Sequence, residues 1–242
     1  MSGKIHIGTS GWNYKHWKGT FYPEDLPQNK WLDFYKNQLD TVEVNNSFYK
    51  LPNKDTLKKW KEEVPKDFIF AAKANRYITH RKKLKEPKDS LKKMLDNFKA
   101  FGENLEPILF QLPPNWNFNE ERLQNFINEL PEDYIYTFEF RDKSWLNDTT
   151  YDMLKDRNIA LCIYELAGFQ SPVEVTADFV YIRLHGPTNQ KYQGKYSKDQ
   201  LSGWADNLKK WKKKDLDVYL YFDNDERGYA AQNAQELKEI TD

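Results

Sequence analysis

The sequence predicts an α/β protein in which eight parallel strands close into one barrel. Three observations favour this fold. Eight short apolar runs alternate with stretches of helical spacing, the 242 residues suit a barrel that forms one unit, and no Gly/Ser-rich linker or repeat divides the chain. We therefore expect a single TIM (β/α)8-type domain over residues 1–242, with the 8 Trp, 15 Tyr and 15 Phe filling its core.

The strands are expected at residues 4–8, 41–44, 68–72, 107–111, 134–140, 160–164, 179–184 and 218–222. Helices are indicated where apolar residues recur three and four positions apart, as in residues 91–98, 123–130 and 201–211. Ser197 and Gln200 have the spacing of a capping box at the start of the last of these. The first and sixth units are irregular, because residues 12–29 read as a long loop and residues 165–178 show no helical pattern.

The overall charge is balanced, with 37 Lys+Arg against 37 Asp+Glu. This balance gives no sign of general attraction to nucleic acid or to an anionic membrane. No apolar run approaches the roughly 20 residues that span a bilayer, and the N-terminus lacks an apolar signal region. We expect a cytoplasmic protein with no membrane contact. Its single cysteine, Cys162, is expected to be an inert core residue.

Alternation along the strands predicts which side chains enter the barrel. If the aliphatic residues face the surrounding helices, the polar residues between them face inward. The inward set is Thr41, Glu43, Asn45, Lys73, Gln111, Thr137, Glu139, Arg141, Tyr164, Tyr181, Arg183, His185 and His6. Most of these lie near the C-terminal ends of the strands, where barrel enzymes carry their sites. Alternation does not decide which residue of the final Asp223-Asn224-Asp225 run points to the axis.

The sequence blocks at these strand ends resemble the YecE-like family, whose domain is described as being of unknown function, number 72. The blocks are GTSGW (8–12), VEVNNSFY (42–49), QLPP (111–114), EFR with SW (139–145), RLHG (183–186) and YFDND with GYA and NA (221–234), together with Lys73 and residues 78–80. They span nearly the whole chain in order. The resemblance implies a TIM barrel and supplies no settled activity or cofactor. Asp223 departs from the Asn that the resemblance leads us to expect.

The predicted lumen suggests acid–base chemistry. Glu43 and Glu139 approach across the mouth as acid and base, and His185 is the best proton-transfer candidate. Trp12 and Tyr14 are stacking candidates for a sugar or a base, although they equally suit a role as a plug of the barrel. The remaining residues expected to bind substrate are Asn45, Gln111, Tyr164 and Asn224.

A small anion is the expected partner of Lys73, Arg141 and Arg183, because these three cations face only two carboxylates that alternation places with certainty. The competing interpretation is a buried ion-pair network that only completes the core. A hard cation held by Glu43, Glu139 and Asp223 or Asp225 is a weaker alternative, and the four histidines form no close pair for zinc. No cofactor is identified.

Charge is uneven along the chain despite its zero sum. Residues 51–100 carry 15 lysines and arginines against 7 acidic residues, whereas residues 101–150 carry 3 against 10. Basic clusters at residues 81–85 and 209–214 suit contacts with nucleic-acid phosphates, although solvated helix faces are the explanation we favour. The leading hypothesis is a hydrolase or lyase for a small polar substrate, phosphorylated or sugar-like. A nucleic-acid-binding, nuclease-like barrel is the alternative.

Overall fold

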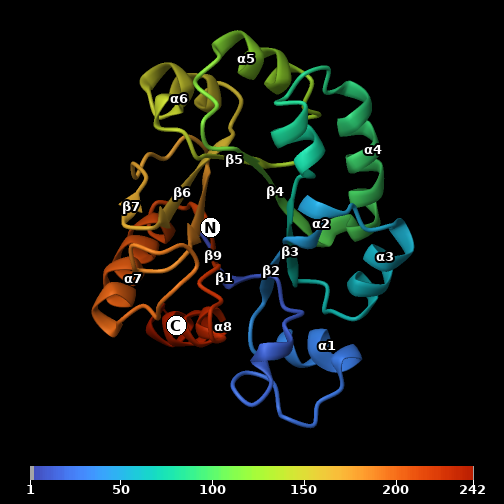
Figure 1. The fold of residues 1–242 in the computed structure, drawn as a ribbon, viewed down its shortest axis with the longest axis vertical. Coiled ribbons are helices and arrows are strands. Elements are labelled where there is room, and N and C mark those ends of the chain that lie inside the picture. Colours follow the sequence, from blue (N-terminus) through green and yellow to red (C-terminus); the bar gives the residue numbers. More distant parts are fainter. Residues whose placement is uncertain (1–2, 242) are drawn as a thin grey trace.

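The chain forms a closed barrel of eight parallel strands in the computed structural model, which describes residues 3–241 (Figure 1). Around the barrel the order is β5-β4-β3-β2-β1-β9-β8-β6, and β5 pairs with β6 to close it, Thr137 lying opposite Ala160. The strands are β1 (Ile5–Ser10), β2 (Thr41–Val44), β3 (Ile69–Lys73), β4 (Leu105–Leu112), β5 (Tyr136–Phe140), β6 (Ala160–Leu166), β8 (Phe179–Leu184) and β9 (Asp217–Phe222). All eight predicted strands are therefore confirmed.

Helices surround the strands on the outside, as Figure 1 shows. They are α1 (Trp31–Tyr35), α2 (Asn46–Tyr49), α3 (Lys54–Glu62), α4 (Lys88–Phe98), α5 (Glu120–Asn128), α6 (Asp148–Lys155), α7 (Lys198–Lys212) and α8 (Tyr229–Thr241). Asparagine side chains cap the first turns of α3, α5 and α6. The predicted capping box between Ser197 and Gln200 begins α7 with both of its hydrogen bonds present.

The two units predicted to be irregular are irregular in the structure. Residues 12–29 contain only short 3-10 turns, at Lys15–Trp17 and the start of Gln28–Lys30. After β6 the chain turns back as β7 (Phe169–Gln170), which pairs antiparallel with β6 in place of a helix. This short hairpin lies at the C-terminal end of β6, so it contributes to the rim of the barrel rather than to its outer layer.

Side chains alternate between two apolar clusters, as the sequence predicted. Along β8, Val180 and Ile182 pack in the large outer cluster with the helices, whereas Phe179 and Tyr181 belong to a small inner cluster. The inner cluster fills the lower and middle barrel with Ala71, Leu109, Ala160, Cys162, Tyr164, Phe179, Tyr181, Tyr219 and Tyr221. Above it, toward the strand tips, the inward positions become polar.

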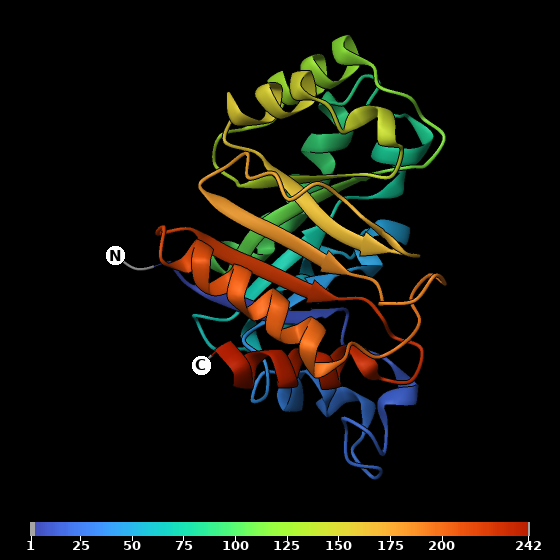
Figure 2. The same ribbon diagram turned by 90° about the vertical axis from the view of Figure 1, so that its left-hand side faces the viewer.

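The strand tips share one end of the barrel. Figure 2 shows β6, β8 and β9 running side by side with their arrowheads on the same side, while β1 begins and α8 ends toward the opposite end. We call the end at the strand tips the mouth. No helix within residues 3–241 has the length and apolar character needed to cross a membrane.

Candidate functional site at the barrel mouth

The polar floor of the mouth is centred on Arg183, at the end of β8. Its side chain is fully buried, and its terminal nitrogens donate to three carboxylates. Nη2 lies 2.8 Å from Oε1 of Glu43 and 3.0 Å from Oδ2 of Asp223, and Nη1 lies 2.8 Å from Oε2 of Glu139. Because an unpaired buried charge is very unfavourable, this pairing is what permits three ionised carboxylates inside the barrel.

Neither oxygen of Glu43 is free. Besides Arg183, the Ser10 hydroxyl donates to Oε1, and the Tyr181 hydroxyl donates to Oε2 at 2.7 Å. The side chain of Glu43 is fully buried. A carboxylate held by three donors and closed off from solvent is well placed to orient its neighbours, and a ligand could reach it only if one of those donors moved away.

Arg141 connects this floor to the space above it. Its Nε donates to Oε1 of Glu139, and its Nη2 lies 3.0 Å from Nε2 of His185. A guanidinium can only donate, so Nε2 of His185 accepts, and Nδ1 donates to Oδ2 of Asp223 at 3.0 Å. We call Glu43, Glu139, Arg141, Arg183, His185 and Asp223 the arginine network.

The cations of the network control the protonation of its carboxylates. Burial by itself would raise the pKa of Glu139, but the charges of Arg141 and Arg183 outweigh it and hold that pKa well below its ordinary value. Asp223 behaves alike: burial opposes the charge, while His185 and Arg183 lower the pKa. Both side chains are therefore carboxylates at neutral pH. This state suits ion pairing better than proton donation.

Asp223 changes the charge count that the sequence suggested. It supplies a third certain carboxylate, so three carboxylates now face the three predicted cations inside the barrel. The prediction that surplus positive charge in the lumen demands an anion is therefore wrong in that form. Arg183 in particular has no exposed surface from which to contact a ligand.

Lys73 differs from the two arginines. It ends β3, is 6% exposed, and its Nζ lies 4.4 Å from the centre of the Phe48 ring. Within residues 3–241 its ammonium has no ion pair or hydrogen bond. Burial, followed by the nearby positive charge of Arg183, lowers the pKa of Lys73 to about 8.

Above the arginine network lies a cavity of about 460 Å³, which we call the mouth cavity. Its volume lies within the roughly 300–1,000 Å³ typical of small-molecule sites. It is lined by Phe48, Tyr49, Lys73, His80, Gln111, Pro114, Arg141, Lys143, Tyr164, Leu166, Ala167, Phe169, Lys191 and Tyr192. No Asp or Glu is among these residues, so every formal charge on the wall is positive.

The positive wall also shifts a histidine. Burial and the cations Lys73, Arg141 and Arg76 lower the pKa of His80 to about 4. Its imidazole is consequently neutral at physiological pH. Aromatic rings accompany the cations: Arg141 lies 5.0 Å from the Tyr164 ring centre, and Lys143 lies 4.6 Å from that of Phe169. The cavity wall therefore combines positive charge with flat apolar faces.

Four residues predicted to bind substrate line the mouth cavity: Lys73, Gln111, Arg141 and Tyr164. Gln111 and Tyr164 both also hydrogen-bond to backbone, at Leu112 O and Phe140 O. Four predicted residues lie in the network beneath the cavity and are fully buried, namely Glu43, Glu139, Arg183 and His185.

The structure places Trp12 and Tyr14 away from the cavity wall. Trp12 is buried, and its ring packs edge-on against that of Trp60 on α3, with the ring centres 4.9 Å apart. The hydroxyl of Tyr14 donates to the carbonyl of Ser10, which fixes the turn after β1. These contacts agree with the structural role that was weighed against sugar stacking. Asn45, at the end of β2, keeps a buried Oδ1 with no hydrogen-bond partner in the described chain.

The Asp223-Asn224-Asp225 run points in three directions. Asp223 turns to the axis, where it meets Arg183 and His185. Asn224 turns outward and donates to Gly194 O and to Oδ1 of a buried asparagine on α8, so it does not line the mouth cavity. Asp225 contacts the ring nitrogen of His16 at 3.0 Å and joins β9 to the first loop. The departure from the expected Asn at 223 thus adds a charge to the network.

Loop residues that the sequence did not single out complete the cavity wall. Phe48, Tyr49, Lys143, Phe169, Lys191 and Tyr192 come from the segments that follow strands β2, β5, β6 and β8. His80, from the block at residues 78–80, also lines the wall. One signal was available, since the VEVNNSFY block includes Phe48 and Tyr49, but loops lack the periodicity that tells which side chains turn inward.

The geometry does not suit a cation held by the acidic residues. The Arg183 guanidinium occupies the space between Glu43, Glu139 and Asp223, where such an ion would sit. Among residues 3–241, no group of three or more His, Cys, Asp or Glu side chains is arranged around a metal position. Burial raises the pKa of the Cys162 thiol, which agrees with an unreactive core residue.

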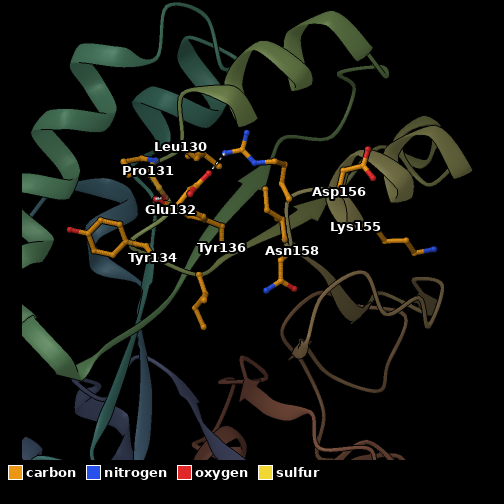
Figure 3. A pocket seen from close by; sticks show the side chains of 11 residues that line it. Leu130, Pro131, Glu132, Tyr134, Tyr136, Lys155, Asp156 and Asn158 are labelled. Atoms are coloured by element: carbon orange, nitrogen blue, oxygen red, sulfur yellow. Dashed lines mark hydrogen bonds and ion pairs between the residues drawn. The ribbon is translucent and has the colours of Figure 1, made fainter.

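A second cavity of about 420 Å³ opens at the opposite end of the barrel (Figure 3). Its lining comes from two segments, residues 130–136 between α5 and the start of β5, and residues 155–159 between the end of α6 and β6. Its lining mixes signs, with Glu132 and Asp156 beside Lys155 and Arg157, and one ion pair spans 4.0 Å between Glu132 and Arg157. In TIM barrels the end at the starts of the strands serves stability, so we assign no site here.

The two predicted basic clusters do not share a surface. Residues 81–85 follow β3 and therefore lie at the mouth, whereas residues 209–214 end α7 just before β9 begins, at the opposite end. Figure 2 shows α7 running along the barrel between these ends. One nucleic-acid strand following a single face would meet only the first cluster.

Comparisons with known proteins agree with the architecture. The family model "Protein of unknown function DUF72" matches residues 6–242. UPF0759 protein YunF of Bacillus subtilis (strain 168) is 26% identical over 270 residues, which cover 98% of this chain and 95% of YunF. UPF0759 protein YecE of Escherichia coli (strain K12) is 25% identical over 138 residues, 57% of this chain and 48% of YecE. The crystal structure of a DUF72 family protein from Thermotoga maritima MSB8 has a TM-score of 0.85 and 26% identity, with 98% of each chain covered.

Proposed function

Because this chain belongs to the DUF72 family, as its YecE-like motifs predicted, we propose from its site that it is an enzyme acting on a small anionic substrate in the mouth cavity. The observation that carries the proposal is the lining of that cavity, which holds Lys73, Arg141, Lys143 and Lys191 and no acidic residue. A wall of one sign, backed by a low-dielectric barrel, attracts the opposite charge strongly. Phosphate or carboxylate groups fit this wall best.

Arg141 is the proposed anchor of the anion. Glu139 and His185 hold its Nε and Nη2, and no residue of the described chain bonds its Nη1. A guanidinium fixed on two sides presents its remaining edge without further loss of side-chain freedom, which favours binding. Lys143 and Lys191 are exposed residues of the rim and complete the charge around the ligand.

The reaction class that we propose is hydrolysis or elimination by acid–base chemistry, with roles revised from those expected. The oxygens of Glu43 and Glu139 are already bonded, so in this proposal they position Arg183 and Arg141. His185 fixes the second edge of Arg141. Lys73 is the group on the cavity wall whose pKa, at about 8, suits proton transfer near neutral pH.

Thermal unfolding with and without anions tests the binding step. Phosphate, sulfate or citrate at about 10 mM should raise the melting temperature by several degrees, because ligand that binds only the folded state stabilises it. The double variant Lys143→Ala/Lys191→Ala should lose most of this shift. The matched control Lys210→Ala, an exposed lysine of α7 outside the cavity, should keep it. No shift with any of the three anions would overturn the proposal.

Nucleic-acid binding is the second candidate, favoured by exposed aromatic residues beside cations at the mouth. Arg76 lies 5.8 Å from the ring centre of Tyr49, which is 66% exposed, and Lys82 lies 5.8 Å from that of Tyr77. Exposed rings next to cations suit stacking on single-stranded bases. This candidate predicts binding to a single-stranded oligonucleotide that weakens steeply with salt and is reduced in Tyr49→Ser and Tyr77→Ser variants.

A further inference from the structure

One side chain of the mouth cavity is built differently from every other buried cation of the site. Arg141 and Arg183 each contact carboxylates, whereas the Lys73 ammonium contacts none and rests over the Phe48 ring. Its backbone is held firmly, since the Ser47 hydroxyl donates to the Lys73 carbonyl at 2.6 Å. A lysine fixed at a strand end, buried, and without a counter-ion is costly for a structural role.

The surroundings of Lys73 make its neutral amine more accessible than that of a solvated lysine. Burial and the charge of Arg183 lower the pKa of Lys73 to about 8, so an appreciable part of the population is unprotonated near neutral pH. Desolvated lysines beside another cation are the ones that act as nucleophiles toward carbonyl groups. The amine also faces a cavity large enough to hold such a compound.

We propose that Lys73 is a nucleophile that forms an imine with a small aldehyde or ketone carrying a carboxylate or phosphate group. The inference rests on the proposed function, because the anionic group would bind at Arg141, Lys143 and Lys191 in the same cavity. The apolar faces of Phe48 and Tyr164 would pack against the carbon chain. The site would then belong to the lyase branch of the proposed chemistry.

The step is balanced without any further reactant. The lone pair of neutral Nζ attacks the carbonyl carbon, a C–N bond forms, and the π electrons of C=O move to oxygen, which takes up a proton. Nitrogen then loses a proton and gives a carbinolamine. Its hydroxyl group leaves as water, with a second proton, while the nitrogen lone pair forms C=N and the last N–H proton is lost. Amine and carbonyl thus become imine and water, with no change in oxidation state.

Reductive trapping of the full-length protein tests the proposal. Pyruvate with sodium cyanoborohydride near pH 8 should convert the imine into a stable secondary amine, located by peptide mass spectrometry. We expect the peptide with Lys73 to be modified at least about tenfold faster than that with Lys210, an exposed lysine of α7, because its amine is less protonated. The rate at Lys73 should rise with pH and level off above about pH 8.

Two further measurements separate a specific site from general lysine reactivity. Acetone replaces the carboxylate of pyruvate with a methyl group, so the ratio of Lys73 to Lys210 modification should fall several-fold. Saturating sulfate should protect Lys73 from pyruvate and leave Lys210 unchanged. The variant Lys73→Arg should give no adduct at this position, and the sulfate protection provides the same test if that variant does not fold.

The outcomes distinguish this inference from the proposed function. If anions stabilise the protein but Lys73 is modified no faster than Lys210, the imine is wrong and anion binding stands. If anions do not stabilise it and Lys73 is not selectively modified, both are wrong. Equal ratios with pyruvate and acetone would overturn the anionic class of the carbonyl compound. Selective, sulfate-protected modification of Lys73 by pyruvate supports the inference in full.

Discussion

The two ends of the barrel carry cavities of similar volume, about 460 Å³ at the mouth and about 420 Å³ at the opposite end. They differ in how charge is arranged. At the mouth the wall is wholly cationic and rests on buried, paired charges, whereas the other cavity mixes acids and bases on exposed helix ends (Figure 3). Space alone therefore does not mark a site. We expect the organisation of charge to do so, because a wall of unpaired charge of one sign attracts the opposite charge.

The mouth itself contains two kinds of charge, paired charges in the arginine network and unpaired charges on the cavity wall. In the arginine network each guanidinium is paired, and the carboxylates hold the arginines in place. On the wall above, Lys73 has no partner in the described chain, and His80 is neutral because burial and the neighbouring cations lower its pKa. Three substitutions and one NMR titration test whether this division, and the contrast between the two ends, is real.

Disrupting the arginine network should have the largest effect on stability. In Arg183→Met, Glu43, Glu139 and Asp223 lose their shared partner inside the barrel. Leaving buried charges unpaired should lower the free energy of unfolding by about 3–5 kcal/mol, measured from the midpoint of urea unfolding. Lys210→Met, on the exposed face of α7, is the control and should stay within about 0.5 kcal/mol of the parent. A loss under about 1 kcal/mol for Arg183→Met would contradict the network.

Removing the unpaired charge of Lys73 should raise the free energy of unfolding rather than lower it. The pKa of Lys73 falls from 10.5 to about 8 on folding, so between these values the unfolded chain binds more protons and stability rises with pH. Below about pH 8 the folded protein carries the full cost of the buried ammonium. Lys73→Met should therefore be more stable than the parent at pH 7, by on the order of 2 kcal/mol.

That advantage should shrink as the pH rises from about 8 toward 10.5, because the parent loses the same charge by deprotonation. Lys73→Arg keeps the charge and should show no gain, which makes it the matched control. Chemical unfolding at pH 7 and pH 10 measures the difference. If Lys73→Met is less stable than the parent at pH 7, Lys73 is a structural partner of the network and the division fails.

A smaller effect is expected at His80 when an anion binds. Its pKa is about 4 because burial, Lys73 and Arg141 disfavour the imidazolium. A bound sulfate would offset the nearby cations, so the pKa of His80 should rise by about one unit, followed by NMR titration. The signals of His6, which stacks on Tyr219 inside the barrel, should not respond to sulfate. An unchanged pKa of His80 in saturating sulfate would place the anion elsewhere.

Alternation predicted the floor of the mouth because it is carried by strands. Glu43, Glu139 and Arg183 each lie between apolar residues that face helices, so period-two spacing was enough to place them in the lumen. Alternation could not predict which of these charged side chains pair with one another. Asp223 lies one position beyond the end of β9, where the next two residues turn away in different directions.

The remaining residues of the cavity wall, and the position of Trp12, could not be predicted for a related reason. Trp12 follows Gly11, whose φ of 92° ends the extended conformation of β1, so alternation no longer decides where Trp12 points. Lys191 and Tyr192 belong to a loop whose path depends on tertiary contacts, among them the tight approach of Gly186 to the carbonyl of Gln193. Such long-range packing leaves no periodic trace in the sequence.

The smallest effect is expected at the opposite end of the barrel, where Arg157→Ala removes one partner of the pair with Glu132. The pair spans 4.0 Å, and the Glu132 side chain is 91% exposed, so water already solvates both charges. The free energy of unfolding should change by less than about 0.5 kcal/mol. More tellingly, the rise in melting temperature caused by sulfate should stay the same as in the parent, whereas Lys143→Ala reduces it. If Arg157→Ala weakened the sulfate effect as much as Lys143→Ala, the anion would bind at the mixed-charge end, and the contrast between the two cavities would no longer identify the site.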